Sequence, residues 1–241
     1  MTTERWEHIQ VNGQTMGAFT ARPEAGVRLP AVVVAQHGYG VDAFVQEMTR
    51  RVAAAGYLGI APDLYHHHGP DASEDVRARV ARLRDAEVIA DVNATVAFLQ
   101  RQDTVLADRI GIMGFCMGGR VVYLMAAVNP AFRAAIPFYG GGTMAPWGEG
   151  LSPFDRLGDI GCPLLGFFGG KDTNPSPQDR EKLDAELTRR GKSHQFHVYE
   201  GAGHGYMDFT NPSRYHADAA QGSWPSVVEF LSRHLQQGSS S

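Results

Sequence analysis

The sequence has few cysteines, no cluster of basic residues and no long apolar segment, and each shortage excludes a class of protein. Its 241 residues include two cysteines, Cys116 and Cys162, too few for a scaffold held by disulfides. There are 22 Lys and Arg against 26 Asp and Glu, a net charge of −4. Without a run of Lys or Arg, the chain lacks the charge pattern of a protein that binds nucleic acid or anionic membranes. No stretch approaches the roughly 18 apolar residues of a transmembrane helix.

The ends of the chain and its bulk composition indicate a compact protein in a reducing compartment. The first residues are charged and lack the apolar core of a signal peptide, so we expect a cytoplasmic location and free thiols. A hydrophobic fraction of 43% with 20% charged residues is sufficient for a large core. We expect residues 1–237 to form one domain and the Gly/Ser-rich residues 238–241 to form a flexible tail.

Glycine, by contrast, is in excess, with 28 residues where the usual share of about 7% gives roughly 17. Between the glycines, short apolar runs typical of buried strands alternate with segments whose apolar residues recur at helical spacing. The expected strands are 31–36, 58–61, 109–113, 134–138, 163–169 and 194–199, and the expected helices are 42–55, 74–102, from the turn at 114–119 to 128, 178–190 and 213–235. Residues 7–11 and 17–22 alternate like an antiparallel edge pair. This order predicts an α/β fold, a mostly parallel central sheet flanked by helices on both faces, with ligands at the carboxyl ends of the strands.

One glycine-rich turn has the pattern of a nucleophile elbow. Gly114-Phe115-Cys116-Met117-Gly118 lies between an apolar strand and an apolar helix, where a strained turn lifts the middle side chain to the top of the sheet. The N-terminus of the following helix favours the thiolate form of a cysteine at that position. The pentapeptide alone is equally consistent with a structural or phosphate-cradling glycine turn.

The order of residues further along the chain favours the catalytic interpretation. His204 lies in a glycine-rich loop after the last expected strand, and Asp172 directly follows the strand at 163–169. Nucleophile, acid and histidine in this order, each at the carboxyl end of a strand, are typical of an α/β hydrolase. We therefore predict a triad of Cys116, His204 and Asp172, in which Asp172 orients the imidazole. The alternative acids Asp179 and Asp184 are interpreted as helix-surface carboxylates, and His216 and His234 as solvated residues of the last helix.

These motifs resemble those of the dienelactone hydrolase family of the α/β-hydrolase superfamily. Besides the Gly-x-Cys-x-Gly-Gly elbow, the sequence has Ala35-Gln36 after the first buried strand, Pro-Asp-Leu-Tyr at 62–65 and Gly-His near the end. The resemblance implies that Cys116 attacks the substrate and His204 transfers protons. It also implies that the backbone N–H groups of Gly38 and Met117 form the oxyanion hole.

Two positions depart from the family's pattern. Where characterised members have a glutamate beside the resting thiol, this chain has His37, which we interpret as part of a His-Gly-x-Gly oxyanion turn. Members also hold a substrate carboxylate with an arginine shortly after the catalytic histidine, and no arginine closely follows His204. We expect that any such cation comes from Arg77, Arg79 or Arg82.

Other residues near the expected site have weaker signals. The expected substrate pocket is formed by residues in or beside loops at the top of the sheet: His37, Tyr39, Phe138, Trp147 and Tyr206. The glycine-rich segment 140–148 is either a mobile lid or a long surface loop. Cys162 is interpreted as a buried structural thiol.

The run His66-His67-His68 is the one feature that suggests a metal. Adjacent side chains on an extended segment point in opposite directions, and no ligand spacing supports a closed site. We therefore expect no metal and no cofactor.

The sequence thus predicts a carboxylic ester hydrolase that cleaves an enol lactone or an activated ester through a thioester acyl-enzyme. Two alternatives remain open: a thioesterase or acyltransferase with the same triad, and a noncatalytic relative that binds a small molecule. The expected partner is a small-molecule substrate, with no nucleic acid and no membrane, and the protein is expected to be a monomer or homodimer.

Overall fold

A computed structural model describes residues 2–24, 27–68 and 75–236. Within these ranges an eight-stranded sheet has the order β1-β2-β4-β3-β5-β6-β7-β8. The strands are β1 (Thr2–Val11), β2 (Gln14–Pro23), β3 (Leu29–Ala35), β4 (Leu58–Pro62), β5 (Val105–Phe115), β6 (Phe132–Phe138), β7 (Leu164–Gly169) and β8 (His194–Tyr199). The pairings of β1 with β2 and of β2 with β4 are antiparallel, and the others are parallel. The expected tail, residues 238–241, lies outside the described residues.

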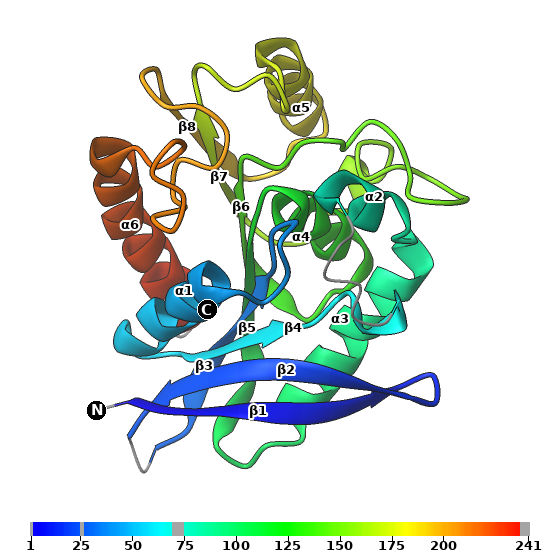
Figure 1. Ribbon diagram of the computed structural model, residues 1–241, viewed down its shortest axis with the longest axis vertical. Coiled ribbons are helices and arrows are strands. Elements are labelled where there is room, and N and C mark those ends of the chain that lie inside the picture. Colours follow the sequence, from blue (N-terminus) through cyan, green and yellow to red (C-terminus); the bar gives the residue numbers. More distant parts are fainter. Residues whose placement is uncertain (1, 25–26, 69–74, 237–241) are drawn as a thin grey trace.

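Helices cover both faces of the sheet (Figure 1). The helices α1 (Ala43–Ala54) and α6 (Ala217–Leu231) pack on one face, and α3 (Asp85–Gln100) and α4 (Met117–Val128) pack on the other. The other α-helices of the described residues are the short helix α2 (Val76–Ala81) and the helix α5 (Pro177–Arg189). Because both faces are covered, β3 is buried along its whole length, as a central parallel strand requires. The predicted α/β architecture is confirmed.

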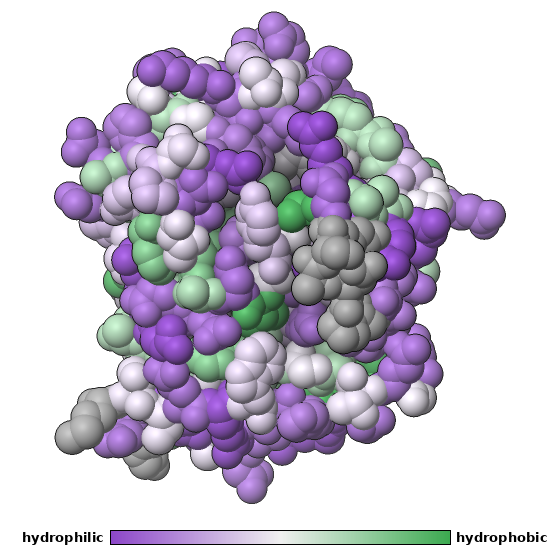
Figure 2. Space-filling model, viewed as in Figure 1, coloured by the Kyte–Doolittle hydropathy of each residue, from purple (hydrophilic) through white to green (hydrophobic). Residues whose placement is uncertain are grey.

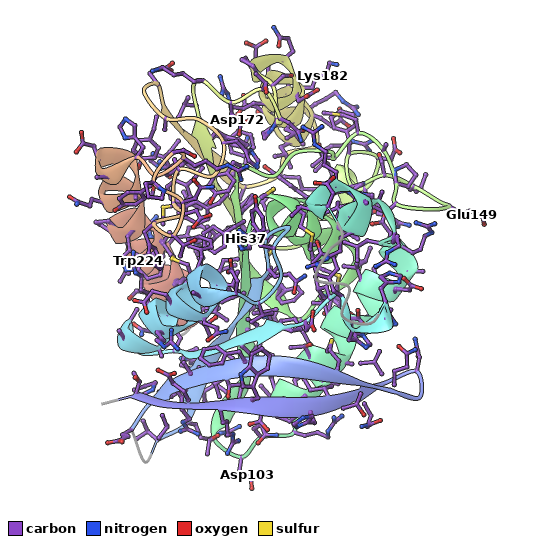
Figure 3. The ribbon with its side chains drawn as sticks, viewed as in Figure 1. His37, Asp103, Glu149, Asp172, Lys182 and Trp224 are labelled. Atoms are coloured by element: carbon purple, nitrogen blue, oxygen red, sulfur yellow. The ribbon has the colours of Figure 1, made fainter. Side chains whose placement is uncertain are left out.

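The carboxyl ends of the parallel strands meet at one end of the sheet. His37, which follows β3, and Asp172, which follows β7, lie toward that end, whereas Asp103, which precedes β5, lies at the opposite end (Figure 3). The face shown in Figure 2 is largely hydrophilic and is hollowed near its centre, where hydrophobic residues are visible. The loops after the strands therefore carry the polar groups from which a site can be built.

The prediction of one helix over 74–102 is wrong in one respect, because this segment forms two helices. The backbone of Arg84 is extended, with φ −124° and ψ 133°. Its guanidinium donates to the carbonyls of Ala81, Arg82 and Leu83 at 3.0–3.2 Å, which supplies donors for the unpaired carbonyls at the end of a helix. Asp85 then begins α3 with its N–H donating to the carbonyl of Trp147 at 2.8 Å. Tertiary contacts, rather than glycine or proline, break the helix.

Two other local predictions also differ from the structure. The last helix begins at Ala217 rather than at 213, because Asn211 forms a turn with Ser213 and His216 is the N-cap residue. Residues His66–His68 form a short 3₁₀ helix, η1, and not an extended segment. Of the helices in the described part of the chain, none is both long and apolar enough to cross a bilayer.

Candidate active site

The turn at Cys116 has the strained geometry of an elbow. Cys116 has φ 55° and ψ −115° and is the N-cap residue of α4, a left-handed conformation that is uncommon for a residue with a side chain. Its N–H donates to the carbonyl of Phe138 at 3.0 Å, which anchors the turn to β6. A Cβ on Gly118 would lie 2.3 Å from the carbonyl oxygen of Ala35. Only glycine therefore lets the helix approach the sheet closely enough to hold this turn.

His204 and Asp172 come together from the loops after β8 and β7. The Nδ1 atom of His204 lies 2.8 Å from Oδ2 of Asp172. The other carboxylate oxygen, Oδ1, accepts the N–H of Asn174 at 2.8 Å, so both oxygens of this buried side chain are bound. The contact through Nδ1 leaves Nε2 as the ring nitrogen available to Cys116.

The environment of His204 favours its protonated form. Desolvation is the largest influence and lowers the pKa, but it is outweighed by hydrogen bonds with the side chains of Asp172 and Cys116 and by their charges, which raise the pKa to about 10. An imidazole stabilised as a cation by a carboxylate on one side and a thiol on the other can exchange a proton with that thiol. The arrangement has the chemistry of a nucleophile, a base and an orienting acid.

Two backbone segments border the thiol at the position where an oxyanion would develop. Met117 is the first residue of α4, so its N–H has no acceptor within the helix. Gly38 lies in the tight turn closed by a hydrogen bond from the N–H of Gly40 to the carbonyl of His37 at 3.0 Å. The Gly38 carbonyl accepts the Tyr65 hydroxyl at 2.9 Å, and the same hydroxyl lies 3.4 Å from Sδ of Met117. Tyr65 thus connects the two segments that carry the candidate oxyanion donors.

Two adjoining cavities open at Cys116 and His204. The first, of about 340 Å³, is bordered by Met117 and lined on its apolar side by Val76, Val80, Ala81 and Trp147. The second, of about 470 Å³, is more polar and is lined by charged and aromatic residues: Asp75, Arg77, Asp208, Arg214, His37, Tyr39 and Tyr139. Gly38 borders both. The thiol therefore faces one apolar and one charged compartment.

Comparison with known proteins identifies the kind of enzyme that has this arrangement. The sequence model of the dienelactone hydrolase family matches residues 16–235. The chain belongs to the dienelactone hydrolase family. It is an ester or lactone hydrolase with the α/β-hydrolase fold, as the sequence predicts.

Individual relatives agree with this assignment along most of their length. A Bradyrhizobium protein described as a probable 2-oxo-3-(5-oxofuran-2-ylidene)propanoate lactonase is 34% identical, over 95% of this chain and 94% of its own. An Escherichia coli protein provisionally described as a carboxymethylenebutenolidase is 33% identical, over 94% of this chain and 85% of its own. A crystal structure from Klebsiella pneumoniae, provisionally described as a dienelactone hydrolase, superposes with a TM-score of 0.89 at 32% identity, over 97% of this chain and 99% of that one. A Pyrococcus horikoshii acylaminoacyl peptidase, 17% identical with a TM-score of 0.75 over 100% of this chain and 43% of its own, shares the fold alone.

The residues expected to line the substrate pocket of this hydrolase separate into two groups. His37, Tyr39 and Trp147 line one or other cavity. Phe138 and Tyr206 line neither of these cavities, so the expectation that they line the pocket differs from the structure. Phe138 is fully buried between Phe115 and Phe167, with ring centroids 4.9 and 4.6 Å away, and Tyr206 is equally buried, with its hydroxyl 2.8 Å from the Ser223 hydroxyl.

The alternative acids are used elsewhere in the hydrolase. Asp179 forms a capping box with Ser176 at the start of α5, and Asp184 lies on α5 with Oδ1 3.1 Å from Nε2 of His194. Both contacts are local, so neither carboxylate faces the catalytic loops. Of the three candidate arginines, Arg77 lines both cavities, whereas Arg79 lies over the ring of Tyr65 at 5.2 Å.

The residue at the position of the family's glutamate contacts a carboxylate. His37 is buried, and its Nε2 atom lies 2.9 Å from Oδ2 of Asp42. Burial raises the pKa of Asp42, but the hydrogen bond and charge of His37 and the N–H groups of Val45 and Phe44 outweigh it and hold the pKa below its usual value. Asp42 also caps α1 by accepting the N–H of Val45 at 3.1 Å. His37 thereby fixes the turn that carries Gly38 to the start of α1.

Arg120 is a residue of the site that the sequence analysis missed. It lies on α4 four residues after Cys116, is buried, and lines the apolar cavity. Its Nη1 and Nη2 atoms donate to the two oxygens of Asp85 at 2.6 and 3.0 Å, and its guanidinium lies 3.8 Å from the ring centroid of Trp147. A charged residue one helical turn after the elbow, within an apolar helix, was the available signal.

The same arginine fixes the loop that the sequence left as either a lid or a surface loop. Arg120 donates to the carbonyls of Gly142 and Ala145 at 2.9 and 2.8 Å. Asp85, its ion-pair partner, accepts the N–H of Trp147 at 2.9 Å. These three hydrogen bonds tie the loop to α3 and α4, which favours a fixed wall of the cavity over a mobile lid.

Proposed function

We propose that this hydrolase cleaves an ester or lactone with Cys116 as the nucleophile and passes through a thioester acyl-enzyme. The observation that carries the proposal is the position of His204, whose ring interacts with Asp172 on one side and with Cys116, on a strained elbow, on the other. Such a constellation converts a thiol into an attacking thiolate and keeps the acquired proton next to the substrate.

The reaction then has two halves, and His204 transfers a proton in each. The Cys116 thiolate adds to the carbonyl carbon, and the oxygen takes the negative charge between the N–H groups of Gly38 and Met117. When the intermediate collapses, the ester C–O bond breaks and His204 gives its proton to the departing oxygen. A water molecule next loses a proton to His204 and attacks the thioester, which releases the carboxylic acid and restores Cys116.

The chemistry of the thiolate restricts the substrate class. A thiolate leaves a tetrahedral intermediate more readily than an ordinary alkoxide, so the forward reaction needs a stabilised leaving oxygen, as in an enol lactone or an aryl ester. The cavities add a second restriction. An apolar acyl part fits beside Trp147, and an anionic substituent in the charged cavity would meet Arg77 and Arg214. Arg214 follows His204 by ten residues, further along the chain than the family's arginine.

Mass spectrometry of the intact protein during turnover of a slow aryl ester tests the proposal. We expect a mass increase equal to the acyl group, located on Cys116 by peptide mapping and sensitive to hydroxylamine. Cys116→Ser is expected to accumulate an oxygen ester, and Cys116→Ala no adduct. An adduct on another residue, or activity of Cys116→Ala close to wild type, would refute the nucleophile.

A panel of lactones and aryl esters, each with and without a carboxylate, then defines the substrate. If Arg77 and Arg214 bind the carboxylate, Arg77→Gln and Arg214→Gln lower kcat/KM for the charged substrates and leave that of the neutral ones unchanged.

A further inference from the structure

A second group of polar side chains converges away from the catalytic loops. Nε2 of His66 lies 2.9 Å from Oδ1 of Asp91, and Nε2 of His67 lies 3.1 Å from each oxygen of the same carboxylate. The two imidazole rings lie side by side, with centroids 3.8 Å apart. The sequence led us to expect neighbouring histidines that diverge; the 3₁₀ turn of η1 directs two of them to one carboxylate.

The cluster is almost closed to solvent. The side chains of His66, His67 and Asp91 are 5%, 11% and 0% exposed. A carboxylate in such a place needs a compensating positive charge.

The hydrogen bonds of His67 point to where that charge lies. Its Nδ1 atom is 2.9 Å from Oε1 of Gln14, an acceptor, so Nδ1 carries the proton in this arrangement. In a neutral ring Nε2 then presents a lone pair toward two carboxylate oxygens, which is repulsive. Either a second proton or a metal cation must lie between them. Among the described residues, Nδ1 of His66 is buried and has no hydrogen-bond partner. This would hold with either a proton or a metal in the cluster, so it does not distinguish the two.

We propose that His66, His67 and Asp91 bind a divalent transition-metal cation of the Zn²⁺ class. Two imidazoles and a carboxylate are a common donor set for such ions, and one ligand atom from each residue lies within 4.8 Å of the others. Ligands about 2.0–2.1 Å from a tetrahedral zinc are roughly 3.3 Å apart, so the contacts of 2.9–3.1 Å need to lengthen by only a few tenths of an ångström. Gln14 supplies the outer-shell acceptor that metal-bound imidazoles require.

The site would have a structural role. Its ligands tie η1 to α3, and Gln14 extends the connection to β2. The residue before His66 is Tyr65, whose hydroxyl binds the Gly38 carbonyl. The ion would hold the segment on which that contact depends, and it takes no part in the ester chemistry.

Zinc binding to protein without a polyhistidine tag tests the proposal. The Cys116→Ala background removes the partly exposed thiol of Cys116 as a competing ligand. We expect one equivalent of Zn²⁺ by isothermal titration calorimetry and a zinc-dependent rise in melting temperature. Adding His67→Ala or Asp91→Asn should abolish both, and Gln14→Ala should weaken binding about 10–100-fold.

His68→Ala is the matched control, because His68 lies in the same turn outside the cluster; it should bind zinc as the background does. His67→Ala is the decisive variant, since His67 is the most exposed of the three proposed ligands, and circular dichroism checks that the variant folds. Substitution with Co²⁺ should give a visible d–d spectrum that disappears in His67→Ala. No binding to the background, or equal binding with and without His67, would show that a proton alone fills the cluster and would overturn the proposal.

Discussion

The two cysteines of the chain lie in environments of opposite character. Cys116 is partly exposed, begins a helix and contacts His204. Cys162 is 7% exposed and precedes Pro163, directly before β7. Burial raises the pKa of the Cys162 thiol to about 12, so it stays protonated at neutral pH. The position of each residue in the fold, and not its type, makes Cys116 the proposed nucleophile and Cys162 a structural thiol.

The largest expected effect comes from removing the sulfur of Cys116 and, separately, that of Cys162. Cys116→Ala is expected to lower kcat/KM for an activated ester by about 10⁴-fold or more, because the proposed nucleophile is lost. Cys162→Ala should keep activity within about twofold and lower stability by about 1 kcal/mol, through the small cavity that it leaves. Steady-state kinetics and urea unfolding measure the two effects. Comparable loss of activity in both variants would mean that the two thiols do not differ in role.

The contact between His204 and Asp172 should be worth nearly as much as the nucleophile. Asp172→Asn keeps the shape of the side chain but removes its charge and offers the ring a donor, which destabilises the productive tautomer. The corresponding change in a serine triad costs about 10⁴ in kcat, and we expect about 10³–10⁴ here. Asp184→Asn, on the surface of α5, is the control and should leave kcat unchanged. A drop of less than tenfold in Asp172→Asn would assign the orienting role to another group.

Much of this site could be predicted from the sequence because its residues lie beside glycine-rich turns at strand ends. Gly114, Gly118 and the loop around His204 are local signals, and the α/β-hydrolase chain order links them. What could not be predicted depends on contacts between distant segments. The break before Asp85 has no glycine or proline; it exists because Arg120 and Trp147 bind Asp85 from two other elements.

The predicted aromatic lining shows the same limit. Phe138 and Tyr206 lie beside catalytic loops in the sequence, as Trp147 does, but the pleat and the packing of α6 turn them into the core. Alternation along a single strand does not reveal which face is covered by which helix. The convergence of His66 and His67 on Asp91 likewise depends on a 3₁₀ turn that a run of three histidines does not indicate.

Backbone crowding gives a further way to separate the surroundings of the two thiols. A Cβ on Gly118 would lie 2.3 Å from a backbone oxygen, whereas a Cβ on Gly161, beside Cys162, would have nothing within 4 Å. Gly118→Ala should therefore lower the free energy of unfolding by about 1–3 kcal/mol and displace the elbow. Gly161→Ala should stay within about 0.5 kcal/mol of wild type. Denaturant midpoints measure both, and equal midpoints would show that the elbow does not need its glycine.

The smallest expected effect is the pH dependence that the charged site confers and the buried thiol does not. The pKa of His204 is raised to about 10 in the folded protein, against about 6.5 when unfolded. Its contribution to stability is therefore complete below about pH 6.5 and is lost as the pH rises through about 10. Because Asp172 supplies part of the shift, wild type should lose about 1 kcal/mol more than Asp172→Asn between pH 6.5 and 10. Other groups titrate alike in both proteins, so the difference between their urea unfolding curves isolates His204. Parallel curves would mean that the histidine is not held as a cation beside the proposed nucleophile.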